Sequence, residues 1–266
     1  MAQAAWRDVW VRQGLPVRLE RFDGTLADLR PPMQAIPKQP SLHATITAVV
    51  ATVIVTIFVF GSLLLLALSV PAVRAGLPAA ISLSIWAHAL LVLTAVVLIA
   101  RRDGVPPEGL GFVRPGRRLL HLLWQIPITI TVLLVVQGVA FAVMSRTPLP
   151  DGGGGLDSLL ANAGPATAIL GFLGIAILAP LWEETVFRGM IFGTVHARRG
   201  TAAAVLVSAT VFAVVHGIPI LLPYLITLGL ALGMLRAFHR NLWGPLVLHA
   251  TINSIAAASL LAAVLR

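Results

Sequence analysis

The sequence contains no cysteine among its 266 residues. A disulfide framework, a thiolate metal site and a cysteine nucleophile are therefore excluded. Charged residues are also scarce, at 11% of the chain against about 25% in a soluble globular domain. Hydrophobic residues make up 58% of the chain, and the mean hydropathy is +0.93. This composition excludes an ordinary soluble domain and predicts an integral membrane protein.

Several apolar runs approach or exceed the roughly 20 residues that cross a bilayer as a helix. The predicted fold is all-α and polytopic, with about seven transmembrane helices. The expected spans are 43–70, 77–100, 119–144, 165–197, 201–216, 220–237 and 242–265. Residues 1–42 are charged, carry proline and lack the short apolar core of a signal peptide, so they are expected to form a separate N-terminal segment. The stretch PDGGGGLD at 150–157 predicts a flexible loop.

Basic residues alternate between the two sides of these spans. Fifteen of the 19 lysines and arginines lie in the N-terminal segment and in the loops after the second, fourth and sixth spans. Such an asymmetry predicts a cytoplasmic N-terminus and contact with the anionic lipid bilayer. No aromatic pattern interleaves the basic residues, so nucleic acid is not an expected partner. Short loops and arginine in excess over lysine favour a bacterial plasma membrane.

Two of the ten acidic residues, Glu183 and Glu184, fall inside an expected span. A charged carboxylate at the centre of a bilayer costs about 2.5–3.5 kcal/mol on insertion scales, so it needs a partner or a use. Glu184 and Arg188 are four residues apart with the glutamate first, which predicts a helical ion pair. Glu183 lies about 100° away around the helix and stays free for chemistry. The alternative is that Glu183 merely binds another span.

Two histidines recur in patterned contexts. FAVVH places Phe212 and His216 four residues apart, and HATIN does the same for His249 and Asn253, so each pair shares a helix face. Glu183 and His216 are similarly distant from the turn between their two spans, which predicts that they lie at a common depth. A tight hairpin would therefore bring them together.

The remaining polar and small residues allow simpler interpretations. His88, inside the second span, is expected to be a packed polar residue. The glycine pairs Gly189 with Gly193 and Gly229 with Gly233 are spaced for close helix packing.

Three motifs in order, EETVFR as EExxxR, FAVVH as FxxxH and HATIN as HxxxN, resemble the CPBP family of intramembrane proteases. This family includes CAAX proteases and bacteriocin-processing enzymes, is also called the Abi family, and contains the type II CAAX prenyl endopeptidase. The resemblance covers about residues 165–253, and GLGFVRPG at 109–116 is similar to a loop of bacterial members. It implies hydrolysis of a peptide bond in a membrane-associated or lipidated substrate. It also implies a catalytic core in the last four helices, at 151–266, with accessory helices at 43–150.

The resemblance also implies a role for each motif residue. Glu183 with His216 would activate a water, while His249 and Asn253 would stabilise the oxyanion or help to hold the site. Three further residues would support them, namely Glu184, Arg188 and Phe212. A general base and oxyanion donors are what peptide hydrolysis requires.

A divalent metal is a second possibility, because members of this family are often called metalloproteases. Zinc could use Glu183, His216 and His249 as ligands and keep an open water position. Asparagine is a poor zinc ligand, and in the sequence no second carboxylate lies near either histidine to orient it. A metal-free water is therefore the favoured interpretation, with no cofactor.

Functions of other classes remain open at this point. The sequence has no HExxH or GxSxG motif for a different protease. A non-proteolytic immunity or scaffold protein could use the same polar cluster for binding. A proton-coupled transporter would also explain glutamate and histidine within a span. The expected partner of the protease is a peptide or a membrane protein.

Overall fold

The structure is a computed structural model that describes residues 37–144 and 164–264. These residues fall in one compact unit, which begins at Pro37. Most of the expected N-terminal segment and the predicted loop at 150–157 lie outside the described residues.

The described part of the chain contains helices and no strand, which confirms the all-α fold class. The long helices are α2 (Leu42–Ser69), α4 (Leu77–Arg102), α6 (Leu122–Met144), α10 (Phe192–Val215), α11 (Leu222–His239) and α12 (Trp243–Val264). Four short helices connect them: α3 (Pro71–Ala75), α5 (Pro107–Leu110), η2 (Arg117–His121) and η5 (Pro219–Leu221). One further segment runs into α10 and consists of α8 (Pro165–Leu173), η3 (Gly174–Leu178), α9 (Ala179–Glu184) and η4 (Thr185–Ile191).

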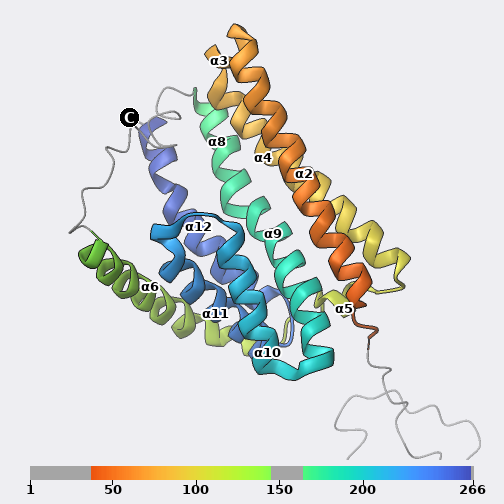
Figure 1. Cartoon of the computed structure of the whole chain (residues 1–266). Helices are drawn as coiled ribbons and strands as arrows, with labels where there is room; N and C mark the ends of the chain where they lie inside the picture. The colour runs from red at the N-terminus through yellow and green to blue at the C-terminus, as the bar shows by residue number, and fades with distance from the viewer. Residues whose placement is uncertain (1–36, 145–163, 265–266) are drawn as a thin grey trace, which may run out of the picture. The chain divides into compact units, whose positions relative to one another are not determined.

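Five helical stretches in the described residues are long and apolar enough to cross a membrane. They are Leu42–Ser69, Leu77–Arg102, Arg117–Val143, Pro165–Val215 and Pro219–His239. The fourth stretch has 51 residues and is interrupted at Gly200, where φ is 80° and ψ is −179°, so the chain reverses within α10 (Figure 1). The chain is therefore an integral membrane protein, and the number of seven spans stays a prediction.

The helix boundaries follow from local chemistry. Ser41 caps α2, because its hydroxyl accepts a hydrogen bond from the N–H of Ala44 at 3.1 Å. The N–H of Ser41 donates to Oδ2 of Asp103 at 2.8 Å, and this hydrogen bond holds the pKa of the Asp103 carboxyl below its usual range. The start of α2 is thereby joined to the end of α4. Between α11 and α12, Oδ1 of Asn241 accepts from the N–H of Trp243 at 3.0 Å and caps the last helix.

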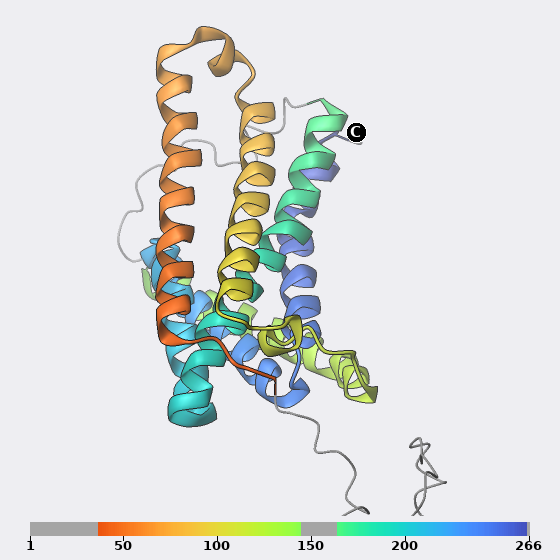
Figure 2. The same cartoon turned by 90° about the vertical axis from the view of Figure 1, so that its right-hand side faces the viewer.

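Two packing arrangements position the site. Helices α2 and α4 run side by side as a hairpin (Figure 2). The second half of α10 packs on α11, where a Cβ added at Gly229 would lie 2.9 Å from the Cα of Ala209. Only glycine permits this approach, so the predicted use of Gly229 in helix packing is confirmed.

Basic side chains gather at one end of the described unit. There α2 begins, α4 and α11 end, and α10 reverses (Figure 2). The basic residues of this end are Lys38, Arg101, Arg102, Arg114, Arg117, Arg118, Arg198, Arg199, Arg236 and Arg240. Among the described residues, the opposite end carries Arg74 in α3. The two sides between which the basic residues alternate in the sequence thus correspond to the two ends of the described unit.

Candidate active site

The two glutamates lie at the end of α9, between the π-helical turns η3 and η4. A π-turn shifts the backbone hydrogen bonds by one residue, which can leave carbonyls available, and such turns are frequent at functional sites. Two carbonyls in these turns accept hydrogen bonds from side chains. The amide of Asn253 donates to the carbonyl of Ile175 at 3.0 Å, and Nε of Arg236 donates to the carbonyl of Arg188 at 3.3 Å.

Glu184 is the centre of a buried polar cluster. Its Oε1 accepts from Nη1 of Arg188 at 3.1 Å, so the predicted ion pair is present. The same oxygen lies 2.8 Å from Nδ1 of His249. Arg188 is fully buried and also donates to the carbonyl of Gly229 at 3.1 Å. The sequence did not indicate the contact between Glu184 and His249, because 65 residues separate them.

Glu183 stands next to this cluster without joining its hydrogen bonds. Its Oε2 lies 3.7 Å from Nε2 of His249 and has no hydrogen-bond partner in the described part of the chain. The exposed fraction of Glu183 is 8%, against 1% for Glu184. The two neighbouring glutamates thus differ in their surroundings, as the sequence predicted.

Phe212 connects the cluster to the second histidine. The guanidinium of Arg188 lies 4.7 Å from the centre of the Phe212 ring, a cation–π contact. The rings of His216 and His249 lie 4.7 Å and 5.7 Å from the same ring. The predicted supporting residue is therefore a shared packing surface for both histidines.

His216 ends α10, and its Nδ1 lies 2.6 Å from the carbonyl of Phe212. A carbonyl only accepts, so Nδ1 carries a proton, and in the neutral ring Nε2 presents a lone pair. The residue is half-buried. His216 can therefore accept a proton at Nε2.

Glu183 and His216 line one cavity of about 550 Å³. The two residues are thus brought to the same cavity, while their common depth in the membrane stays a prediction. Helices α9, η4 and α10 form one side of the cavity, and α2 and α4 form the other, with Thr52, Thr56 and His88 among the lining residues. The helices expected to be accessory therefore contribute a wall of the candidate site.

Two predicted site residues lie away from this cavity. His249 is buried behind the glutamates, and Asn253 is bound to η3; neither lines the cavity.

The sequence did not indicate that Arg236 is buried, because it placed this residue among the basic residues of a turn. Arg236 is 9% exposed and packs over Phe192, 5.6 Å from the ring centre. Its position in the last turn of α11, within reach of the apolar interior, was the available signal.

The side chains considered as metal ligands do not converge. Among the described residues, no group of three histidine, aspartate or glutamate side chains is arranged to hold a metal ion. Nδ1 of His216 is bonded to a carbonyl, and Nδ1 of His249 is bonded to Glu184. Bonds of this kind orient a ring and leave its Nε2 as the possible ligand atom, and Glu184 is a carboxylate partner of His249 that the sequence did not reveal. Because the described histidine and glutamate side chains do not gather in a group of three, no metal enters the steps derived below.

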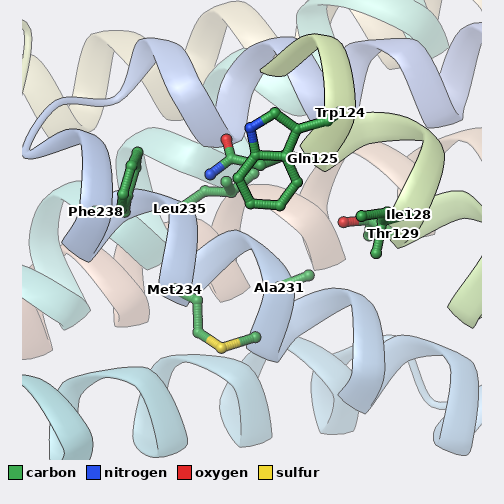
Figure 3. Close-up of a pocket in the computed structure, with 8 residues that line it drawn as sticks. All are labelled: Trp124, Gln125, Ile128, Thr129, Ala231, Met234, Leu235 and Phe238. Carbon is green, nitrogen blue, oxygen red and sulfur yellow. The ribbon is translucent and has the colours of Figure 1, made fainter. Parts of the chain in front are cut away.

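A second cavity, of about 360 Å³, lies between α6 and α11 (Figure 3). It is lined by Trp124, Gln125, Ile128, Thr129, Ala231, Met234, Leu235 and Phe238. This lining carries no acidic, basic or imidazole side chain, so it offers no group for acid–base chemistry.

The fold and this site together define an all-α integral membrane protein with a buried cluster of glutamate, arginine and histidine beside a cavity. Residues 165–255 match the family model described as "Type II CAAX prenyl endopeptidase Rce1-like". The match spans 91 of the 266 residues and includes all three motifs. This part of the chain is similar to that family, which confirms the resemblance to the CPBP membrane proteases. No curated protein and no solved structure matches the chain.

Proposed function

We propose that this protein is an intramembrane endopeptidase that hydrolyses a peptide bond of a membrane-associated or lipidated substrate with a water held by Glu183 and His216. The observation that carries the proposal is that these two side chains line the same cavity. The family match supports the class of activity, an endopeptidase of the CAAX type acting in the membrane.

The geometry favours a water between two acceptors. Glu183 offers a carboxylate, and His216 offers Nε2, because its Nδ1 is held by the Phe212 carbonyl. A water that donates one hydrogen to each acceptor directs a lone pair to the substrate carbonyl. As the new C–O bond forms, a proton passes to Glu183 or His216. The same proton then goes to the leaving amine when the C–N bond breaks.

The buried cluster behind the cavity positions this pair. His249 is fixed through Nδ1 by Glu184, and its Nε2 faces Glu183 at 3.7 Å. Nε2 can donate toward Glu183 only when the ring carries both protons. These contacts favour a holding role for His249 and Asn253 over a role as oxyanion donors.

The orientation of the protein is part of the proposal. The basic end of the described unit is expected to face the cytoplasm, with the N-terminus on that side. A bacterial plasma membrane is the expected location. Expected substrates are peptides or tails of membrane proteins.

The test compares the peptide termini of membrane proteins in cells with wild-type protein and cells with Glu183→Gln. The glutamine keeps the side-chain volume but cannot accept the proton, so the new termini should disappear and turnover should fall about 10²–10⁴-fold. Glu108→Gln is the matched control, because Glu108 is an exposed glutamate in α5 that does not line the cavity. Normal cleavage by the Glu183→Gln protein would refute the mechanism. The absence of any wild-type-specific termini would refute the proposed activity.

A further inference from the structure

The α2–α4 side of the cavity carries polar groups that the proposed hydrolysis does not use. Thr52 and Thr56 are one helical turn apart on α2, and His88 reaches the cavity from α4. The exposed fraction of His88 is 5%. Its ring lies 5.0 Å from the ring of Trp182, the residue before Glu183, in an edge-to-face contact.

The hydrogen bonds of this group fix the direction of each donor. The hydroxyl of Thr56 donates to the carbonyl of Thr52 at 2.8 Å, so its single proton is used. Nε2 of His88 lies 2.8 Å from the same hydroxyl oxygen. The hydroxyl can therefore only accept from His88, and Nε2 carries the ring proton. Nδ1 of the neutral ring is then an acceptor.

This acceptor has no partner among the residues that the structure describes. The described residues offer Nδ1 of His88 no hydrogen bond, and this atom is not one of the fully buried polar atoms that lack a partner. A histidine that served packing alone would be expected to satisfy both ring nitrogens. His88 satisfies one nitrogen through Thr56 and leaves the other available beside the cavity.

The chemistry of the cavity indicates what this acceptor would bind. A protease must reach the scissile carbonyl, so the bound segment is extended and its backbone N–H groups are not used in a helix. The rest of the lining is largely apolar, with valine, isoleucine and phenylalanine side chains. In such surroundings each unpaired N–H is costly and requires an acceptor.

We propose that His88 is a substrate-binding residue, which accepts a hydrogen bond at Nδ1 from a backbone N–H of an extended apolar peptide in this cavity. Thr56 is its positioning residue, because it holds the ring in the Nε2–H form. The inference rests on the proposed function and adds to it that α2 and α4 bind the substrate.

Four variants separate this role from packing. His88→Phe keeps an aromatic ring and removes the acceptor, whereas His88→Gln can donate to Thr56 and still offer an amide oxygen. Thr56→Val is nearly isosteric but lets the histidine ring change its tautomer, which turns Nδ1 into a donor. Thr56→Ser keeps the hydroxyl and is the matched control.

The experiment measures binding without turnover, so that it stays separate from the test of hydrolysis. Each variant is placed in a Glu183→Gln background and titrated in detergent micelles with one probe. The probe is a fluorescein-labelled peptide with a leucine- and valine-rich centre and lysine ends. One hydrogen bond corresponds to an increase in Kd of about 3- to 10-fold.

The expected result is weaker binding by His88→Phe and Thr56→Val, with binding by His88→Gln and Thr56→Ser close to the background protein. In the active protein, the same two changes should raise KM and leave kcat nearly unchanged. Equal affinity of the background protein and its His88→Phe variant would overturn the assignment, as would the absence of saturable binding to the background protein. Absence of hydrolysis by the protein with Glu183 intact, together with the expected pattern of Kd, would count against the proposed function alone.

Discussion

Replacement of Glu184 by glutamine should destabilise the protein far more than the same replacement of its neighbour Glu183. Oε1 of Glu184 is hydrogen-bonded to both Arg188 and His249, and the exposed fraction of Arg188 is 0%. Loss of one member of a buried ion pair typically costs 3–5 kcal/mol, because the remaining charge stays buried without compensation. Glutamine keeps the volume and an oxygen that accepts hydrogen bonds. We therefore expect a loss near the lower limit, about 3 kcal/mol in the free energy of unfolding.

The matched control is Glu183→Gln. Among the described residues, its Oε2 has no hydrogen-bond partner and no arginine forms an ion pair with it. The assay is equilibrium unfolding of both variants in mixed micelles with increasing denaturing detergent. A double variant, Glu184→Gln with Arg188→Met, removes the unpaired charge. Its loss should be smaller than the sum of the two single losses by about 1–3 kcal/mol.

Two results would contradict this reasoning. Equal stability of the Glu184→Gln and Glu183→Gln proteins would mean that the two carboxylates are equivalent in folding. Strict additivity in the double variant would mean that the charge of Arg188 is compensated elsewhere.

Three further predictions concern packing, pH and topology. Gly229→Leu should lower the free energy of unfolding by about 1–3 kcal/mol or more, because even its Cβ would lie 2.9 Å from the backbone of α10. The control Gly138→Ala has open space around its Cβ and should change this free energy by less than about 1 kcal/mol. The pKa of Asp103 is lower in the folded state, so the stability that it contributes is complete above the unfolded pKa of about 4 and is lost as the pH falls below that value. Unfolding measured as a function of pH should therefore show a smaller loss of stability at acid pH for Asp103→Asn. A cysteine at the exposed position Arg199 should react in intact cells with membrane-permeant maleimides only. A cysteine at the exposed position Arg74 should also react with impermeant maleimides. The reverse pattern would invert the proposed orientation.

The sequence by itself determined the class of molecule and most of the polar cluster. A helix has a fixed geometry, so the spacing of Glu184 and Arg188 was sufficient to predict their ion pair. The high cost of a charge in a bilayer singled out Glu183 and Glu184 among ten acidic residues. The apolar runs and the alternation of basic residues are informative for a similar reason. Both are properties of the local chain that depend only on its interaction with the membrane.

Only the tertiary structure decided which distant groups meet. His249 reaches Glu184 across 65 residues, and the lone pair of His216 is defined by a carbonyl of its own helix end. The cavity wall formed by α2 and α4, with His88 in it, depends on how that hairpin packs against α9. Contacts of this kind arise from the relative rotation and tilt of whole helices, and hydropathy and motif spacing along a single span contain no information about either.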